Sequence, residues 1–240
     1  SQVKVRAINA NPAKPTIPGV SPQTLTVKGK LVLTNPVTAG VVWDVGVDKS
    51  VTWTRTGSVG NIHLDYDYGS GFATIAGAEN LASSLQTFTW NVPNTVSSNV
   101  VLRIVPINAS EADQDDSVSF KIAAALQLDS PLGGEVWVVD DNQPITWTKR
   151  GTIANVVLKY DTAAGLGGYP NTIATRPAGD GSYSWPVPDA IGNQLRVRIE
   201  DAVASDTQLD ASPANFAIRG SVTVTRPVGT GPAKQVWISE

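Results

Sequence analysis

The residues of this chain that could carry chemistry are one histidine and two loops rich in carboxylates. His63 is the only histidine and cysteine is absent, so a histidine metal site lacks partner ligands and a catalytic triad lacks a second recognisable element. His63 alternates with Ile62 and Leu64, which predicts an exposed position on a strand. The sequence therefore predicts no catalytic residue and no enzyme. Carboxylates brought together by folding, as glycoside hydrolysis needs, are the alternative left open.

The two acidic loops occupy equivalent places along the chain. The loop "NASEADQDDS" at 108–117 contains Glu111, Asp113, Asp115 and Asp116, and "EDAVASDTQLDAS" at 200–212 contains Glu200, Asp201, Asp206 and Asp210. Calcium takes about six to eight oxygen ligands, but the spacing differs between the loops and neither has an EF-hand pattern. We predict solvated hairpin loops whose acids cap turns, with no cofactor and no metal ligand, and calcium as the alternative.

Three shorter features are also candidate sites. "DYDYGSG" at 65–71 looks like a calcium loop, yet the equivalent stretch reads "KYDTAAG", so a hairpin turn is predicted. "NAS" at 108–110 matches the acceptor pattern for N-glycosylation. One strand position carries an arginine in each repeat, which predicts cross-strand pairs on a solvated face: Arg6, Arg103 and Arg198.

The elements that position these residues repeat along the chain. "VTWTRTGSVGNIHLDYD" at 51–67 matches "ITWTKRGTIANVVLKYD" at 145–161, and "FTWNVPNTV" at 88–96 matches "YSWPVPDAI" at 183–191. Such self-similarity decides the fold class. All seven tryptophans fall on the repeat: Trp43 with Trp137 and Trp237, Trp53 with Trp147, and Trp90 with Trp185.

Each repeat is predicted to consist of strands. Apolar residues alternate with polar ones in runs such as "SVTWTRT", "NIHLDY" and "TFTWNV", and turns containing Gly, Pro, Asn or Asp separate the runs. We predict an all-β fold of tandem immunoglobulin-like antiparallel β-sandwich domains with little or no helix. Residues 31–126 and 127–220 are the complete domains. Residues 1–30 are expected to be the end of a preceding repeat, and 221–240 the first strand of a following one.

The tryptophans divide into two predicted roles. Those on the alternating strands are expected in the core: Trp53, Trp90, Trp147 and Trp185. Those beside the Pro-Gly joints between repeats are predicted to pack between domains, with an exposed platform for sugars as the alternative: Trp43, Trp137 and Trp237.

The composition of the chain argues against two classes of partner, nucleic acids and the membrane interior. The formal net charge is -3, only 16% of the residues are charged, and no Lys/Arg cluster occurs, which argues against nucleic acid. No apolar run has membrane length, so no membrane insertion is expected in this segment. The absence of cysteine fits an exported surface protein.

The succession of Pro, Gly and Trp, then "ITWT", "NVVL", "YSWPVP", "VRI" and "FAI", resembles the Kre9/Knh1-like repeat, an immunoglobulin-like module of exported cell-wall and surface proteins. The resemblance covers residues 31–220 and implies an extracellular location with a structural or wall-associated role. It brings no catalytic residue.

We therefore predict a structural repeat segment of a larger exported cell-surface protein: an S-layer, sheath, stalk or wall component that acts as a rigid spacer. The expected partners are other copies of itself or neighbouring repeats, and cell-wall glycan is a further candidate. The main alternative is an adhesin or carbohydrate-binding module that uses loops or exposed aromatics. An accessory region of a secreted hydrolase is a third. Partial repeats of neighbouring chains that complete each other are a further hypothesis.

Overall fold

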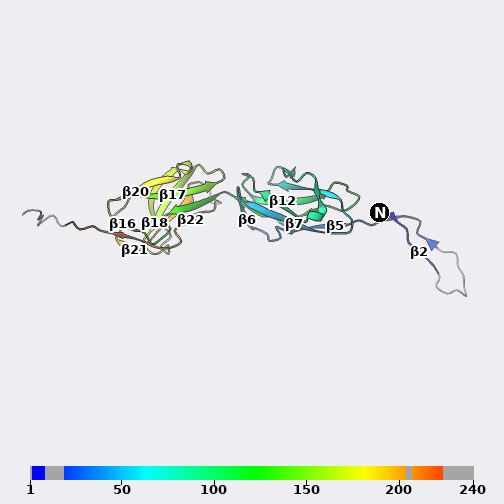
Figure 1. The fold of residues 1–240 in the computed structure, drawn as a ribbon, viewed down its shortest axis with the longest axis horizontal. Helices are drawn as coiled ribbons and strands as arrows, with labels where there is room; N and C mark the ends of the chain where they lie inside the picture. The colour runs from blue at the N-terminus through cyan, green and yellow to red at the C-terminus, as the bar shows by residue number, and fades with distance from the viewer. Residues whose placement is uncertain (1, 9–18, 204–206, 224–240) are drawn as a thin grey trace, which may run out of the picture. The chain divides into compact units, whose positions relative to one another are not determined.

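The computed structural model describes residues 2–8, 19–203 and 207–223 of the chain (Figure 1). It divides into two compact units, Ser1–Ala125 with Arg150–Thr152 and Leu126–Lys149 with Ile153–Glu240. The described residues are almost entirely strand and turn, and their helices are two short 3-10 turns, η1 (Ser83–Leu85) and η2 (Ala178–Asp180). The predicted all-β fold of tandem immunoglobulin-like sandwiches is confirmed.

The first residues of the chain form two short antiparallel ladders. β1 (Gln2–Val3) pairs with β4 (Leu25–Thr26), and β2 (Arg6–Ala7) pairs with β3 (Gly19–Val20). Arg6, opposite Val20, is exposed. The assignment of residues 1–30 and 221–240 to neighbouring repeats stays a prediction.

The first unit packs two sheets against each other. The smaller has the order β11-β7-β5 and the larger β10-β8-β12-β14-β6, with β9 paired to β8 and β13 to β12. The strands are β5 (Lys30–Asn35), β6 (Val42–Asp44), β7 (Asp48–Thr56), β8 (Asn61–Asp67), β9 (Ala73–Thr74), β10 (Leu81–Ala82), β11 (Thr87–Asn91), β12 (Ser97–Pro106), β13 (Asp115–Asp116) and β14 (Phe120–Ala123).

The second unit has the same plan. Its smaller sheet is β15-β17-β20 and its larger sheet is β16-β23-β21-β18-β19, with β22 paired to β21. The strands are β15 (Ala125–Ser130), β16 (Val136–Val138), β17 (Asn142–Arg150), β18 (Asn155–Asp161), β19 (Asn171–Pro177), β20 (Ser182–Pro186), β21 (Gly192–Asp201), β22 (Asp210–Ala211) and β23 (Phe216–Arg219).

Strand alternation selects the residues of each core. In β12 every second residue from Val100 to Pro106 is buried, and in β21 every second residue from Leu195 to Ile199 is buried. Successive side chains of a strand point to opposite faces, so the hydrophobic positions of the repeat all enter the space between the sheets. The period-two pattern of the sequence is therefore the direct cause of the sandwich.

The first strand of each unit changes sheets at a proline. The peptide bonds Asn35–Pro36 and Ser130–Pro131 are cis, and each lies between the strand of the smaller sheet and the strand of the larger one. After the proline, β6 pairs in parallel with β14, and β16 pairs in parallel with β23. This parallel pairing brings the tryptophan that follows each Pro-Gly joint next to the last strand of its own unit.

Candidate functional site

Four tryptophans lie in the cores, as predicted. Trp53 and Trp147 are 1% and 2% exposed, and their indole N–H groups donate to Ser83 O (2.9 Å) and Ala178 O (3.0 Å). A buried indole N–H needs an acceptor, and the 3-10 turn supplies it in both units. The other two, Trp90 and Trp185, are 5% and 4% exposed.

The prediction for Trp43 and Trp137 is wrong. Both are buried in the core of their own unit, at 4% and 6% exposure, rather than between domains or on an open platform. Trp43 lies opposite Ile122 in the β6–β14 pairing, and its ring centroid is 4.7 Å from that of Phe120. Trp137 takes the equivalent place, with its ring centroid 4.7 Å from that of Phe216. Trp237 lies outside the described residues.

Two acids of the predicted loops perform the same structural task. The Asp115 carboxylate accepts a hydrogen bond from Leu33 N (2.8 Å), and the Asp210 carboxylate accepts one from Leu128 N (2.8 Å). Each acid therefore ties the first strand of its unit to the short strand, β13 or β22, that precedes the last strand. Two residues later a serine accepts from the neighbouring strand, Ser117 from Leu102 N and Ser212 from Val197 N, both at 3.0 Å. The signal in the sequence is an Asp-x-Ser spacing common to both repeats.

Other carboxylates of these loops are also bound by the protein. Glu111 accepts from Gly60 N (2.6 Å), Asp113 pairs with Lys28, and Asp201 accepts from Val203 N (2.9 Å) and from the Thr207 hydroxyl (2.8 Å). Within residues 2–8, 19–203 and 207–223 no three His, Cys, Asp or Glu side chains are grouped as a metal ion would require. Asp206 lies outside these ranges. Asp201 caps a turn through Val203 N, so the prediction is confirmed there. It is wrong for Asp115, Asp210 and Glu111, because each accepts from a backbone N–H far along the chain instead.

The stretch 65–71 is a turn built around one carboxylate. Asp67 Oδ1 accepts from the N–H groups of Gly69 (2.7 Å), Ser70 (3.1 Å) and Gly71 (2.9 Å). These backbone donors, Gly69 first and Gly71 next, lower the pKa of Asp67 below its ordinary value because they stabilise the charged form. Gly69 and Gly71 have φ of 109° and 99°, which glycine adopts without strain. The hairpin-turn prediction is confirmed.

The arginines differ between the units. Arg103 donates to both Asp116 oxygens (2.6 and 2.8 Å), and the two residues are opposite each other across β12 and β13, so the cross-strand prediction is confirmed there. Asp116 raises the pKa of Arg103. Arg198 faces Ala211 across β21 and β22, and it pairs along its own strand with Glu200 (2.9 Å). The cross-strand prediction is wrong for Arg198 because its opposite residue has no carboxylate.

His63 and the glycosylation motif lie on the outer surface of the first unit. The His63 side chain is 27% exposed, less open than predicted, and Nε2 lies 3.4 Å from Asp65 Oδ2. Asn108 Oδ1 accepts from the Ser110 amide (3.2 Å) and hydroxyl (2.8 Å), so the motif forms a local turn. Glycosylation of Asn108 stays a prediction.

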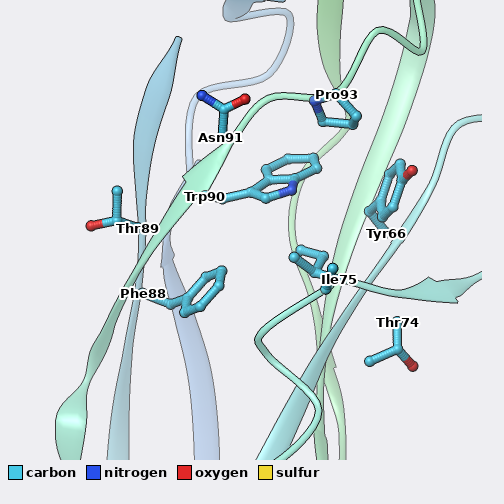
Figure 2. A pocket seen from close by; sticks show the side chains of 9 residues that line it. Tyr66, Thr74, Ile75, Phe88, Thr89, Trp90, Asn91 and Pro93 are labelled. Atoms are coloured by element: carbon cyan, nitrogen blue, oxygen red, sulfur yellow. The ribbon is translucent and has the colours of Figure 1, made fainter. Parts of the chain in front are cut away.

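A pocket of about 450 Å³ in the first unit is the candidate binding site. Figure 2 shows Phe88 and Trp90 of β11 pointing into it, toward Tyr66 of β8 and Ile75, while Thr89 and Asn91 point away. Thr74, Ala76 and Pro93 complete the lining. This volume is within the range of ligand pockets.

The lining of this pocket is uncharged and mostly apolar. None of its lining residues is an acid, a base at neutral pH or a charged group. It offers apolar side chains with threonine and asparagine at the rim. Sequence reasoning missed the pocket because Tyr66, Phe88 and Trp90 lie on strands that read as core, and because the loop at 74–76 meets β11 only in the folded unit.

No helix among the described residues has the length and hydropathy needed to cross a membrane.

A scan against protein-family models finds no match, and neither does a search of curated proteins. Among solved structures, the chain is similar to the fibronectin(III)-like modules of Clostridium thermocellum CbhA, with 15% identity, coverage of 79% of this chain and 94% of that one, and a TM-score of 0.31. The FN1-FN3 domains of chicken CNTN1 match with 12% identity, coverage of 75% of this chain and 65% of theirs, and a TM-score of 0.33.

Three N-terminal domains of the Highly Immunogenic Outer Capsid protein of bacteriophage RB49 match with 9% identity, coverage of 86% of this chain and 75% of theirs, and a TM-score of 0.31. The chain spans less than two thirds of the chicken fragment. The assignment of the fold rests on the strand order of the two units rather than on these matches.

Proposed function

We propose that the two units are structural repeats of an exported cell-surface protein, which serve as rigid spacers in an S-layer, sheath, stalk or wall and belong with the Kre9/Knh1-like repeats. The fold is common in structural and adhesive modules of cell-surface proteins. The observation that carries the proposal is that the acids and tryptophans that could have formed a site instead hold the fold together. Asp115 and Asp210 hold strands together in both units, and the paired tryptophans fill both cores.

A spacer needs domains that resist deformation, and the contacts of each unit suit that demand. The carboxylate of Asp115 or Asp210 binds a backbone N–H of the first strand of its unit. The first strand is therefore held by this hydrogen bond as well as by its pairing with the neighbouring strand. Trp43 and Trp137 fix the continuation of that strand in the core. Close packing of large aromatic groups makes an interior stiff.

The location is tested with antibodies raised against the chain. Gold-labelled antibodies should bind intact cells of the source organism, and at an S-layer or sheath the label should follow the whole envelope. Antibodies reach a chain on the cell surface without permeabilisation of the cells. Labelling that appears only after the cells are opened would overturn the proposal.

The second candidate is an adhesive or carbohydrate-binding module, and the pocket beside Phe88 is the observation that favours it. A glycan array probed with the chain and with Phe88→Ala tests this function. Binding that is lost in the variant supports a glycan site, whereas an array without binding leaves the spacer function as the better account.

A further inference from the structure

The outer strands of the first unit differ in how their free backbone groups are covered. At β5, the N–H of Leu33 donates a hydrogen bond to the Asp115 carboxylate. In the larger sheet, β6 at one end has three residues and ends in an acid, Asp44, and β9 and β10 at the other end have two residues each. β11 is different: it is an outer strand of the smaller sheet, it has five residues, and none of them is charged. Short strands, charges and capping groups are the usual means of blocking an edge, and β11 has none of them.

The register of β11 shows which of its backbone groups have no strand partner within residues 2–8, 19–203 and 207–223. Trp53 N donates to Gln86 O at one end of the ladder with β7, and Val92 N donates to Val47 O at the other end. Hydrogen-bonded pairs alternate along an antiparallel ladder, so Phe88 and Trp90 bond to β7. The N–H and C=O groups of the alternate residues therefore face outward, and all three residues are exposed: Thr87, Thr89 and Asn91.

The pocket runs along this edge. Phe88 and Trp90 point into it from β11, and Ile75 faces them from the other side (Figure 2). A strand added to β11 would place every second side chain on the same face as Phe88 and Trp90, which is the face of the pocket. An extended peptide could therefore pair its main chain with the outward N–H and C=O groups of β11 and place its alternate side chains in the apolar pocket.

We propose that the β11 edge and its pocket form a strand-addition site for an extended, uncharged peptide segment of a partner protein, with large apolar residues at alternate positions. Main-chain pairing supplies affinity in this mode of recognition, and the pocket supplies specificity. The absence of charge in β11 and in the pocket lining selects an uncharged segment.

Two other occupants fit these observations less well. A sugar stacks on an open, flat aromatic face, but Trp90 is 5% exposed, and Tyr66 and Phe88 are only partly exposed. In a second copy of this chain, Phe88 and Trp90 of β11 would remain directed into their own unit and would not fill the pocket. A segment without a core of its own has its apolar side chains free to do so.

The second unit contains a natural control. Trp147 N donates to Gly181 O and Val187 N donates to Asp141 O, so the outward residues of β20 are Ser182, Ser184 and Pro186. Pro186 stands where the first unit has Asn91, opposite the first residue of β17 as Asn91 is opposite the first residue of β7. Proline has no N–H to offer, so this edge lacks one of the donors that β11 presents.

The test uses the full chain and a capped seven-residue peptide in which threonine alternates with valine, phenylalanine and valine. In an NMR titration, we expect the amides of Thr87, Thr89 and Asn91 to shift and to exchange more slowly, and those of Ser182 and Ser184 to respond less, because β20 lacks one donor. Asn91→Pro should weaken binding about tenfold, because one main-chain hydrogen bond to the peptide is lost. The β20 edge indicates that β11 will accommodate this proline.

Asn91→Ala is the matched control. It removes the side-chain hydrogen bond from Asn91 Nδ2 to Asp48 Oδ1 (2.8 Å) but keeps the backbone N–H, so binding should stay within about twofold. A second probe leaves the protein unchanged: the same peptide N-methylated at its pairing positions should not bind. This probe keeps the test decisive even if Asn91→Pro fails to fold.

Four outcomes would overturn the proposal. The first two are binding that survives both Asn91→Pro and N-methylation, and slowed amide exchange at an edge other than β11. The third is a dimer in sedimentation experiments that dissociates in the Asn91→Pro variant. The fourth is a glycan that displaces the peptide. The inference rests on the proposed surface function only for its biological setting. If the chain binds the peptide but the antibodies do not label intact cells, only the surface function is contradicted.

Discussion

The two units have the same interior but different edges. Trp53 and Trp147 donate to equivalent 3-10 turns, and Asp115 and Asp210 bind equivalent first strands. The outer strand of the larger sheet, in contrast, consists of two-residue pieces in the first unit and of the seven-residue β19 in the second. Interior positions are constrained by packing, whereas an edge contacts little of its own unit and is free to diverge.

The long β19 edge is protected in its own way. Its register with β18 shifts between Leu158 and Lys159, so Ile173 has no opposite residue, and the strand ends at Arg176 and Pro177. Bulges, charges and prolines all discourage the addition of another strand. The second unit therefore blocks β19 by a bulge and β20 by Pro186, while the first unit leaves β11 open. The two units therefore differ in which edges are open to a further strand and not in their repeated core.

The largest expected effect comes from removing the shared core tryptophan. Trp53→Ala should lower the free energy of unfolding of the first unit by about 3–5 kcal/mol, and Trp147→Ala that of the second unit by a similar amount, because each leaves a cavity and an unpaired carbonyl. Urea unfolding followed by NMR reports each unit separately. Thr54→Ala, at an exposed position, is the control and should change it by about 0.5 kcal/mol or less. A loss confined to one of the two tryptophan variants would break the equivalence of the cores.

The next effect concerns the repeated carboxylate. Asp115→Ala and Asp210→Ala should each cost about 1–3 kcal/mol, because Leu33 N or Leu128 N loses its acceptor. Thermal unfolding of both variants measures this loss. Asp115→Asn and Asp210→Asn keep an acceptor oxygen and should lie closer to the original chain. Equal stability of the alanine variants and the original chain would show that the carboxylates do not hold the first strands.

A smaller effect is expected on the outer faces, where the units differ. Ala211→Asp places a carboxylate opposite Arg198, as Asp116 is opposite Arg103. The second unit should gain about 0.2–1 kcal/mol, as cross-strand charge pairs do. Chemical unfolding at low and high salt tests it, and the gain should shrink at high salt. A destabilised Ala211→Asp chain would mean that Glu200 already satisfies Arg198.

The smallest effect is local to the turn at 65–71. The pKa of Asp67 lies below its ordinary value of 3.8, so the stabilisation of the turn is present above that pH and is lost as the pH falls through the lower, folded-state value. The NMR signals of the Gly69 and Gly71 amides should therefore titrate below pH 3.8. In Asp67→Asn this titration should vanish. A midpoint at or above the ordinary value would contradict the three-donor turn.

Much of the fold could be predicted because the same strand pattern occurs in both repeats. Trp53 and Trp147 alternate with apolar residues on strands, and that local pattern is enough to place them in a core. Trp43 and Trp137 could not be placed in this way. Their burial depends on parallel pairing with β14 and β23, strands that lie far along the chain, and no local pattern indicates that pairing.

The candidate site was harder to predict than the core. Its side chains are of core type, and its openness comes from the meeting of β11 with the loop at 74–76, which is a property of the folded unit. One difference was visible in the sequence: "FTWN" in the first repeat against "YSWP" in the second. Its meaning depends on the register, because only the register shows that Asn91 and Pro186 face outward.

Amide hydrogen exchange of the free chain measures in one experiment whether the two interiors are equivalent and whether the β11 edge is open. We expect similarly slow exchange for the amides of Trp53 and Trp147, which donate to Gln86 O and Gly181 O, and fast exchange for those of Thr89 and Asn91. Slow exchange at Thr89 and Asn91 would show that the edge is covered, and clearly unequal protection of the two tryptophan amides would show that the interiors differ.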